Sequence, residues 1–157
     1  MTMAIWIPTS LLILSAALDL RFAKFPNWLF LASAGLGVLW LTLHHSLADL
    51  ASLLTYSLLF FVVLIPFFYF KIFGAGDIKL LTSLSLFVSV PTAATVLVYS
   101  LFWGLLIGLL KIGLSGEIVT FVQSLLLRNP QVRSHKIPFA VAILIGWCTF
   151  LVAGDIL

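Results

Sequence analysis

The chain has 157 residues, of which 63% are hydrophobic and 8% are charged, and its mean hydropathy is +1.27. A soluble domain has about 45–50% apolar and about 25% charged residues, so this composition excludes a soluble enzyme, a soluble nucleic-acid binder and a disordered tail. The net charge of +3 comes from eight Lys and Arg against five Asp and Glu, so the positions of the charges carry more information than their sum. We therefore expect an integral membrane protein in contact with the lipid bilayer.

Apolar segments follow one another along the whole chain. A membrane-spanning helix needs about 20 apolar residues, so six spans leave only short loops, and a single membrane domain over residues 1–157 is predicted. The segments are too long and uniformly apolar for barrel strands, and the helix is the other structure that satisfies its own backbone in lipid. The six predicted helices cover Met3–Leu18, Trp28–Leu43, Leu50–Phe70, Ile78–Val90, Thr92–Leu110 and Ile137–Ala153.

The basic residues all fall on alternate loops. The second and fourth loops and both termini contain no Lys or Arg. Because basic residues concentrate in cytoplasmic loops, we expect loops one, three and five in the cytoplasm and both termini outside. This topology explains the positive charge without a nucleic-acid partner. The basic residues are Arg21 and Lys24 in loop one, Lys71 and Lys79 in loop three, and Lys111, Arg128, Arg133 and Lys136 in loop five.

The fifth loop is the only long connection and contains a pattern of its own. Between Glu117 and Arg128, polar residues recur at helical spacing while aliphatic and aromatic residues fill the other face. This pattern predicts an amphipathic helix in the cytoplasmic interface. Two interpretations stay open: a simple linker at the membrane surface, and a surface that guides a membrane-embedded substrate.

Two acidic residues border predicted helices on the cytoplasmic side, outside the amphipathic segment. Asp19 follows the first span and Asp77 precedes the fourth. Ionisable groups beside hydrocarbon are costly and mark functional sites. Each also has a structural explanation, because Asp77 can cap a helix and Asp19 can pair with Arg21 at the interface.

Two details favour a functional interpretation of Asp77. The segment Ile78–Val90 covers about 20 Å as a helix, which is short of the roughly 30 Å core. The fourth helix therefore either runs past Pro91 or starts below the membrane surface. Asp77 also follows Gly74 and Gly76, and glycine permits a positive φ and the close approach of another chain.

A pair of carboxylates at one depth suggests aspartic protease chemistry. Two like charges a few Å apart do not both ionise cheaply, so one is protonated and the other is not. The ionised carboxylate takes a proton from water as it attacks a peptide carbonyl, and the protonated one donates to the oxyanion. A proton or ion relay is the alternative, although such relays usually lie near the middle of the membrane.

Together these residues resemble the GxGD aspartyl proteases of the prepilin peptidase family. The resemblance rests on Asp19-Leu20-Arg21, on Phe25-Pro26-Asn27 and on the segment from Gly74 to Leu80, which reads GAGDIKL. The stretch from Lys136 to Ala140 is similar to the Pro-aromatic segment that opens the last helix of that family. The six-helix plan covers essentially the whole chain.

The resemblance implies a function and a site. Asp19 and Asp77 correspond to the catalytic pair, and Gly74 and Gly76 to glycines of the active-site loop. The family removes basic leaders from prepilins and pseudopilins, just before a hydrophobic helix, at the cytoplasmic face of the bacterial inner membrane. The short chain looks like the prepilin peptidases of Flp-type (tight-adherence) pilus systems, with an archaeal preflagellin peptidase as the alternative.

One departure from the family narrows the expected activity. Larger bifunctional members carry a four-cysteine zinc motif in an N-terminal extension and methylate the new N-terminus. Here Cys148 is the only cysteine and Asp19 lies early in the chain. We therefore expect no zinc or other metal, no cofactor and no methyltransferase activity. A catalytically silent pilus-assembly subunit and an ion-coupled carrier stay as alternative functions, and the sequence does not predict the oligomeric state.

Overall fold

The computed structural model describes residues 3–22, 26–70, 72–114 and 139–154. In these ranges the chain forms only helices, as the sequence predicts. They are α1 (Met3–Phe22), α2 (Asn27–His44), α3 (Leu47–Tyr69), α4 (Ala75–Phe87), α5 (Val90–Leu114) and α7 (Phe139–Gly154). The predicted amphipathic helix at residues 117–128 lies outside the described residues, as do five of the basic residues: Lys24, Lys71, Arg128, Arg133 and Lys136.

Three of these helices contain segments long and apolar enough to cross a membrane. The segments are Asn27–His44 in α2, Asp49–Tyr69 in α3 and Val90–Lys111 in α5, and α7 is a shorter apolar helix. Their outer faces expose large aliphatic and aromatic side chains over much of the surface. Exposing such surface to water costs about 25 cal/mol per Å², and lipid removes that cost. The helices therefore indicate a membrane protein.

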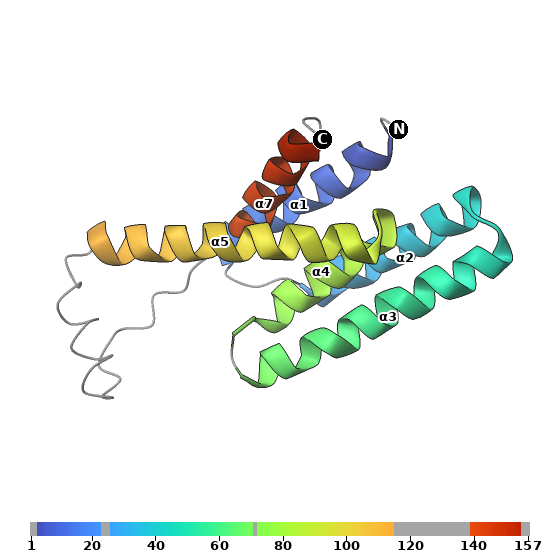
Figure 1. Ribbon diagram of the computed structural model, residues 1–157, viewed down its shortest axis with the longest axis horizontal. Helices are drawn as coiled ribbons and strands as arrows, with labels where there is room; N and C mark the ends of the chain where they lie inside the picture. The colour runs from blue at the N-terminus through green and yellow to red at the C-terminus, as the bar shows by residue number, and fades with distance from the viewer. Residues whose placement is uncertain (1–2, 23–25, 71, 115–138, 155–157) are drawn as a thin grey trace.

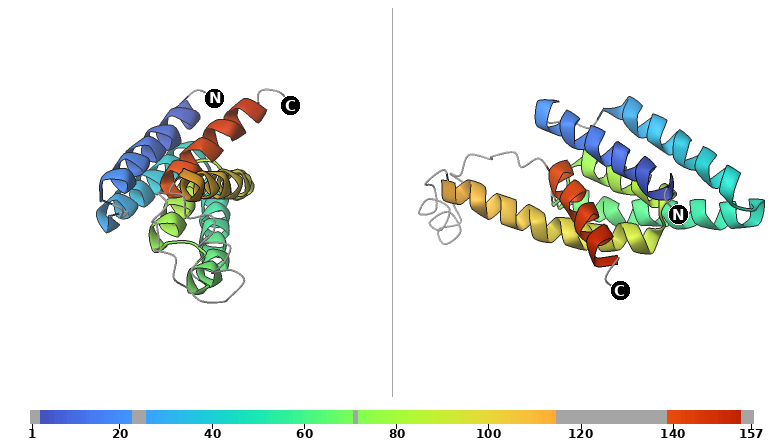
Figure 2. Two further views of the ribbon diagram at one scale, coloured as in Figure 1. Left: turned by 90° about the vertical axis from the view of Figure 1, so that its left-hand side faces the viewer. Right: turned by 90° about the horizontal axis from the view of Figure 1, so that it is seen from above.

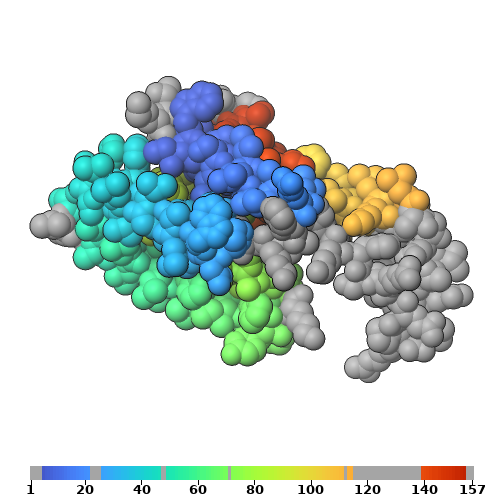
Figure 3. Space-filling view, turned by 180° about the vertical axis from the view of Figure 1, so that it is seen from behind, coloured from blue at the N-terminus to red at the C-terminus, as the bar shows by residue number. Residues whose placement is uncertain are grey.

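The short helix α4 lies at the centre of the molecule. It packs against every other described helix (Figures 1 and 2), while α1, α2 and α3 form most of the face seen from behind (Figure 3). Leu80, Leu81 and Leu84 are at most 1% exposed. The buried hydroxyls of Ser33 and Ser83 are 2.9 Å apart and join α2 to α4 by a hydrogen bond, which satisfies polar groups that would be costly to bury alone.

The end of α4 decides between the two explanations for its short length. The helix has 13 residues and ends at Phe87, so the alternative in which it runs past Pro91 is wrong. The chain restarts in α5, where the Ser89 hydroxyl accepts the Thr92 N–H at 3.4 Å. Pro91 lies in the first turn of α5, where a missing backbone N–H costs little.

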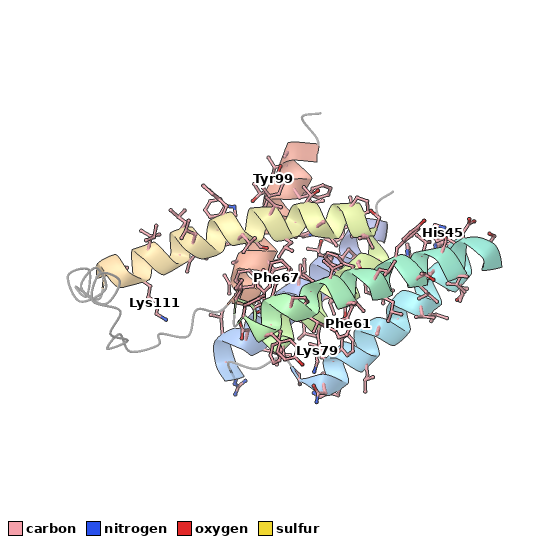
Figure 4. The ribbon with its side chains drawn as sticks, turned by 60° about the horizontal axis from the view of Figure 1, so that its bottom comes forward. His45, Phe61, Phe67, Lys79, Tyr99 and Lys111 are labelled. Atoms are coloured by element: carbon pink, nitrogen blue, oxygen red, sulfur yellow. The ribbon has the colours of Figure 1, made fainter. Side chains whose placement is uncertain are left out.

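Successive helices run in alternating directions. The ends of α1, α3 and α5 and the starts of α2, α4 and α7 lie on one side of the molecule, at the left of Figure 1. Lys111 and His45 mark the two opposite sides in Figure 4. Helices α1 and α5 each continue four residues beyond the predicted apolar segments, because hydropathy marks the apolar span whereas helical hydrogen bonding continues through the polar residues beyond it.

The seam between α5 and α7 fixes the position of α7. A Cβ built on Gly146 would lie 2.8 Å from the backbone nitrogen of Ser100, so the two helices approach backbone to backbone. On its other side α7 is joined to α1, because the Trp147 ring nitrogen donates to the Thr9 hydroxyl at 2.9 Å. The start of α7 is thereby placed beside the end of α1.

Candidate active site

Asp19 lies in the last turn of α1, facing the start of α7. The backbone N–H of Ala140 donates to Oδ2 of Asp19 at 3.4 Å. Ala140 is in the first turn of α7, where N–H groups have no partner within their own helix and carry partial positive charge. The first turn of α7, whose position depends on packing against α5, therefore also holds the carboxylate of Asp19. This side chain is half-buried.

Asp77 occupies the third position of α4, within the first turn of the helix rather than before it. Its Oδ2 accepts the backbone N–H of Gly74 at 3.0 Å, so the carboxylate turns back over the start of its own helix. This hydrogen bond is the reciprocal half of a helix N-terminal capping arrangement. The structural explanation for Asp77 is thus present in the fold, and it holds the carboxylate in a defined orientation.

The two glycines before Asp77 occupy different positions relative to α4. Gly74 is the residue that precedes α4, with φ −74° and ψ 154°, a conformation open to any residue. Gly74 therefore does not use the positive φ that glycine permits. What matters there is space, because a Cβ on Gly74 would lie 3.1 Å from Oδ2 of Asp77. Gly76 is in the first turn of the helix rather than in the loop.

The two aspartates lie near enough to influence each other. Asp77 stands outside the three candidate membrane spans, and its burial raises its pKa from the ordinary 3.8 to about 6. The hydrogen bond from Gly74 opposes this rise in pKa, and the negative charge of Asp19 adds to it. Both acids that the sequence singled out are therefore brought to one place, where burial favours the protonated form of Asp77.

A second contact joins two of the motifs. Nζ of Lys79 donates to Oδ1 of Asn27 at 2.6 Å and stands 5.9 Å from the centre of the Phe30 ring. Lys79, labelled in Figure 4, follows Asp77 by two residues on α4, and Asn27 is the first residue of α2. The sequence marked both residues as motif positions, but it gave no indication that they meet.

Two aromatic residues precede the backbone donors that hold the aspartates: sequence reasoning included Phe139 in its Pro-aromatic segment but missed Phe73. Phe73, which is 5% exposed, directly precedes Gly74, and Phe139 directly precedes Ala140. Their rings lie 5.4 Å apart with planes at 49°, within the usual range for aromatic pairs. For Phe73 the only available signal was an aromatic residue next to the glycine motif, which is unremarkable in a chain that contains 14 Phe residues.

Comparison with known proteins gives one family. Residues 6–109, about two-thirds of the chain, match the model of the type IV leader peptidase family. The match includes Asp19 and Asp77 and ends within α5, before α7. Neither a curated protein nor a solved structure matches the chain.

Proposed function

Because the chain belongs to the type IV leader peptidase family, we propose that it is a membrane aspartyl endopeptidase acting on Flp-type prepilins or pseudopilins. Family membership supports a leader-peptidase function in general. The observation that carries the specific proposal is the electrostatic coupling of Asp19 to Asp77 at the junction of α1, α4 and α7. Aspartic proteolysis requires two acids that share one proton, and the raised pKa of Asp77 favours the sharing of a proton.

The proposed reaction assigns a role to each carboxyl. Asp19, ionised, takes a proton from water as the water oxygen attacks the carbonyl carbon of the peptide bond that is cleaved. Asp77, protonated, donates a hydrogen bond to the carbonyl oxygen as it becomes an oxyanion. When the C–N bond breaks, the leaving nitrogen takes a proton from the pair, and the two products are a carboxylic acid and a new N-terminal amine.

The charges on the described residues support a cytoplasmic site in the bacterial inner membrane. Arg21, Lys79 and Lys111 belong to the end of α1, the start of α4 and the end of α5, on the side that carries both candidate catalytic acids. Asp49 is in the first turn of α3, on the opposite side. With the positive-inside bias, we propose six crossings with both termini outside, in which the short helix α4 crosses surrounded by the other helices and carries Asp77 at its cytoplasmic end.

The proposed substrate class comes from the family, and the acidic pair is compatible with it. An acidic pair attracts a basic leader, and the surrounding Lys and Arg offset part of that attraction. A hydrophobic helix directly after the leader would remain in the lipid beside the protein, so the bond to be cleaved lies at the membrane surface. We accordingly propose a prepilin whose basic leader ends just before its hydrophobic helix.

Co-expression with a Flp-type prepilin tests the proposal. Wild type, Asp19→Asn and Asp77→Asn are compared at matched membrane levels, with leader removal measured by gel mobility and N-terminal sequencing. Asp49→Asn is the matched control, since it makes the same chemical change in an exposed acid on the opposite side. We expect leader removal by wild type and Asp49→Asn and none by the other two variants.

Each other outcome has a definite meaning. Near-normal cleavage by Asp19→Asn or Asp77→Asn would remove that residue from the mechanism. Intact prepilin in every lane, repeated across a panel of prepilins and pseudopilins, would refute the peptidase activity in favour of a silent assembly subunit or an ion-coupled carrier.

A further inference from the structure

The carboxylate of Asp19 depends on another helix for its hydrogen bond. Its donor is the N–H of Ala140 at 3.4 Å, so a shift in the start of α7 moves the donor away from the acid. Phe139, the residue before this donor, is the first residue of α7. The contacts of the Phe139 ring therefore bear directly on the position of Asp19.

The carboxylate of Asp77 depends in the same way on the residue before its donor. The N–H of Gly74 holds Oδ2 of Asp77 at 3.0 Å, and Phe73 directly precedes Gly74. The segment before α4 is anchored to the end of α3, because the N–H groups of Ile72 and Phe73 both donate to the carbonyl oxygen of Phe67, at 3.0 and 3.4 Å. The Phe73 ring also lies 5.7 Å from the Phe67 ring.

The contact between the Phe73 and Phe139 rings connects the two segments that hold the acids. Phe73 and Phe139 stand 5.4 Å apart, each directly before a backbone N–H that holds one carboxylate. Gly104 of α5 leaves the space that the Phe139 ring occupies, because a Cβ there would lie 3.0 and 3.3 Å from two ring carbons. The ring is thus confined between the segment before α4 on one side and α5 on the other.

We propose that Phe73 and Phe139 are positioning residues whose ring contact sets the separation of Asp19 and Asp77. The catalytic significance of that separation rests on the proposed function, but the separation itself does not. Catalytic groups must be held within about 0.5 Å of the productive geometry. If either ring is lost, the contact that holds the first turn of α7 against the segment before α4 is gone, so the Ala140 N–H can move away and the two acids can separate.

Cysteine cross-linking measures the separation without any need for activity. Asp19→Cys and Asp77→Cys are combined in a Cys148→Ser background, since Cys148 is an exposed free cysteine. The membranes are treated with copper phenanthroline or a short bis-methanethiosulfonate reagent, and the cross-linked fraction is read by an intramolecular mobility shift. We expect efficient cross-linking in this parent, and an absence of cross-linking would overturn the proposal because the acids would not be held together.

The ring variants are then introduced into the cross-linking parent. Phe139→Leu and Phe73→Leu should each lower the cross-linking rate severalfold, and the two together should lower it no further because they remove the same contact. Phe139→Tyr, which keeps the ring, should restore the rate. Phe150→Leu is the matched control, because Phe150 belongs to a different ring pair on α7, 5.8 Å from Trp147. A parental rate in Phe139→Leu and Phe73→Leu would refute the proposal.

Kinetics on prepilin separate positioning from a general loss of structure. For Phe139→Leu at matched membrane levels we expect kcat to fall by about tenfold or more, as misplaced reacting groups do, with KM within about twofold of wild type. A rise in KM with unchanged kcat would overturn the positioning role. If Asp19→Asn retained cleavage while the cross-linking results held, the proposed function would fail and the structural inference would stand.

Discussion

Gly146 is the position at which the packing of α7 can be tested most directly. In Gly146→Ala the new Cβ would lie 2.8 Å from the nitrogen of Ser100, 3.1 Å from its Cα and 3.1 Å from the carbonyl oxygen of Val96. All three are backbone atoms of α5, so no side chain can turn aside to make room. The variant forces α5 and α7 apart along their seam.

The expected cost follows from the size of that overlap. Ordinary contacts of this kind begin near 3.4 Å, so the new methyl group is several tenths of an ångström too close. Overpacking of this kind typically costs about 1–3 kcal/mol. Replacing Gly by Ala within a helix returns about 1 kcal/mol through helix propensity. We therefore expect Gly146→Ala to lower the free energy of unfolding by up to about 2 kcal/mol.

Gly35→Ala is the matched control for this measurement. Gly35 lies inside α2, and a Cβ there would meet nothing within 4 Å, so the variant gains helix propensity without a clash. The two variants should differ by about 1–3 kcal/mol, which is a separation of several degrees in Tm for a chain of this size. Thermal unfolding of the detergent-solubilised proteins measures it. If Gly146→Ala were as stable as Gly35→Ala, the backbone contact of α5 with α7 would not exist as described.

Three further predictions concern the candidate site. The pKa of Asp77 is raised from 3.8 to about 6 in the folded protein, so as the pH rises the unfolded chain loses this proton before the folded protein does. The free energy of unfolding should therefore fall by up to about 3 kcal/mol between roughly pH 4 and 6 and stay lower above that range. A pH series of melting curves should show this slope in wild type and not in Asp77→Asn. Lys79→Met and Asn27→Ala each break a 2.6 Å hydrogen bond and should each cost about 1 kcal/mol; additive losses in the double variant would contradict their coupling. Gly74→Ala brings a Cβ within 3.1 Å of the Asp77 carboxylate and should slow prepilin cleavage severalfold; wild-type kinetics would show that the carboxylate is free to move.

The local amino-acid pattern was sufficient for several features. Long apolar runs predict helices because a backbone in lipid must satisfy its own hydrogen bonds, and every regular element in the described residues is a helix. Asp19 and Asp77 stood out because acids next to apolar segments are rare. Alternation of the helices along the chain then placed both on one side. Their catalytic role, the six crossings and the Flp-type substrate stay predictions.

Only the tertiary structure decided which side chains meet. The helices are apolar on nearly all sides, so no apolar stripe tells which face of each packs against its neighbours. The central position of α4, the Ala140 N–H on Asp19 and the contact of Phe73 with Phe139 depend on how each helix is rotated and tilted. Rotation and tilt are set by close packing at sites such as Gly146, which join segments far apart in the chain, and a local pattern of residues does not carry that information.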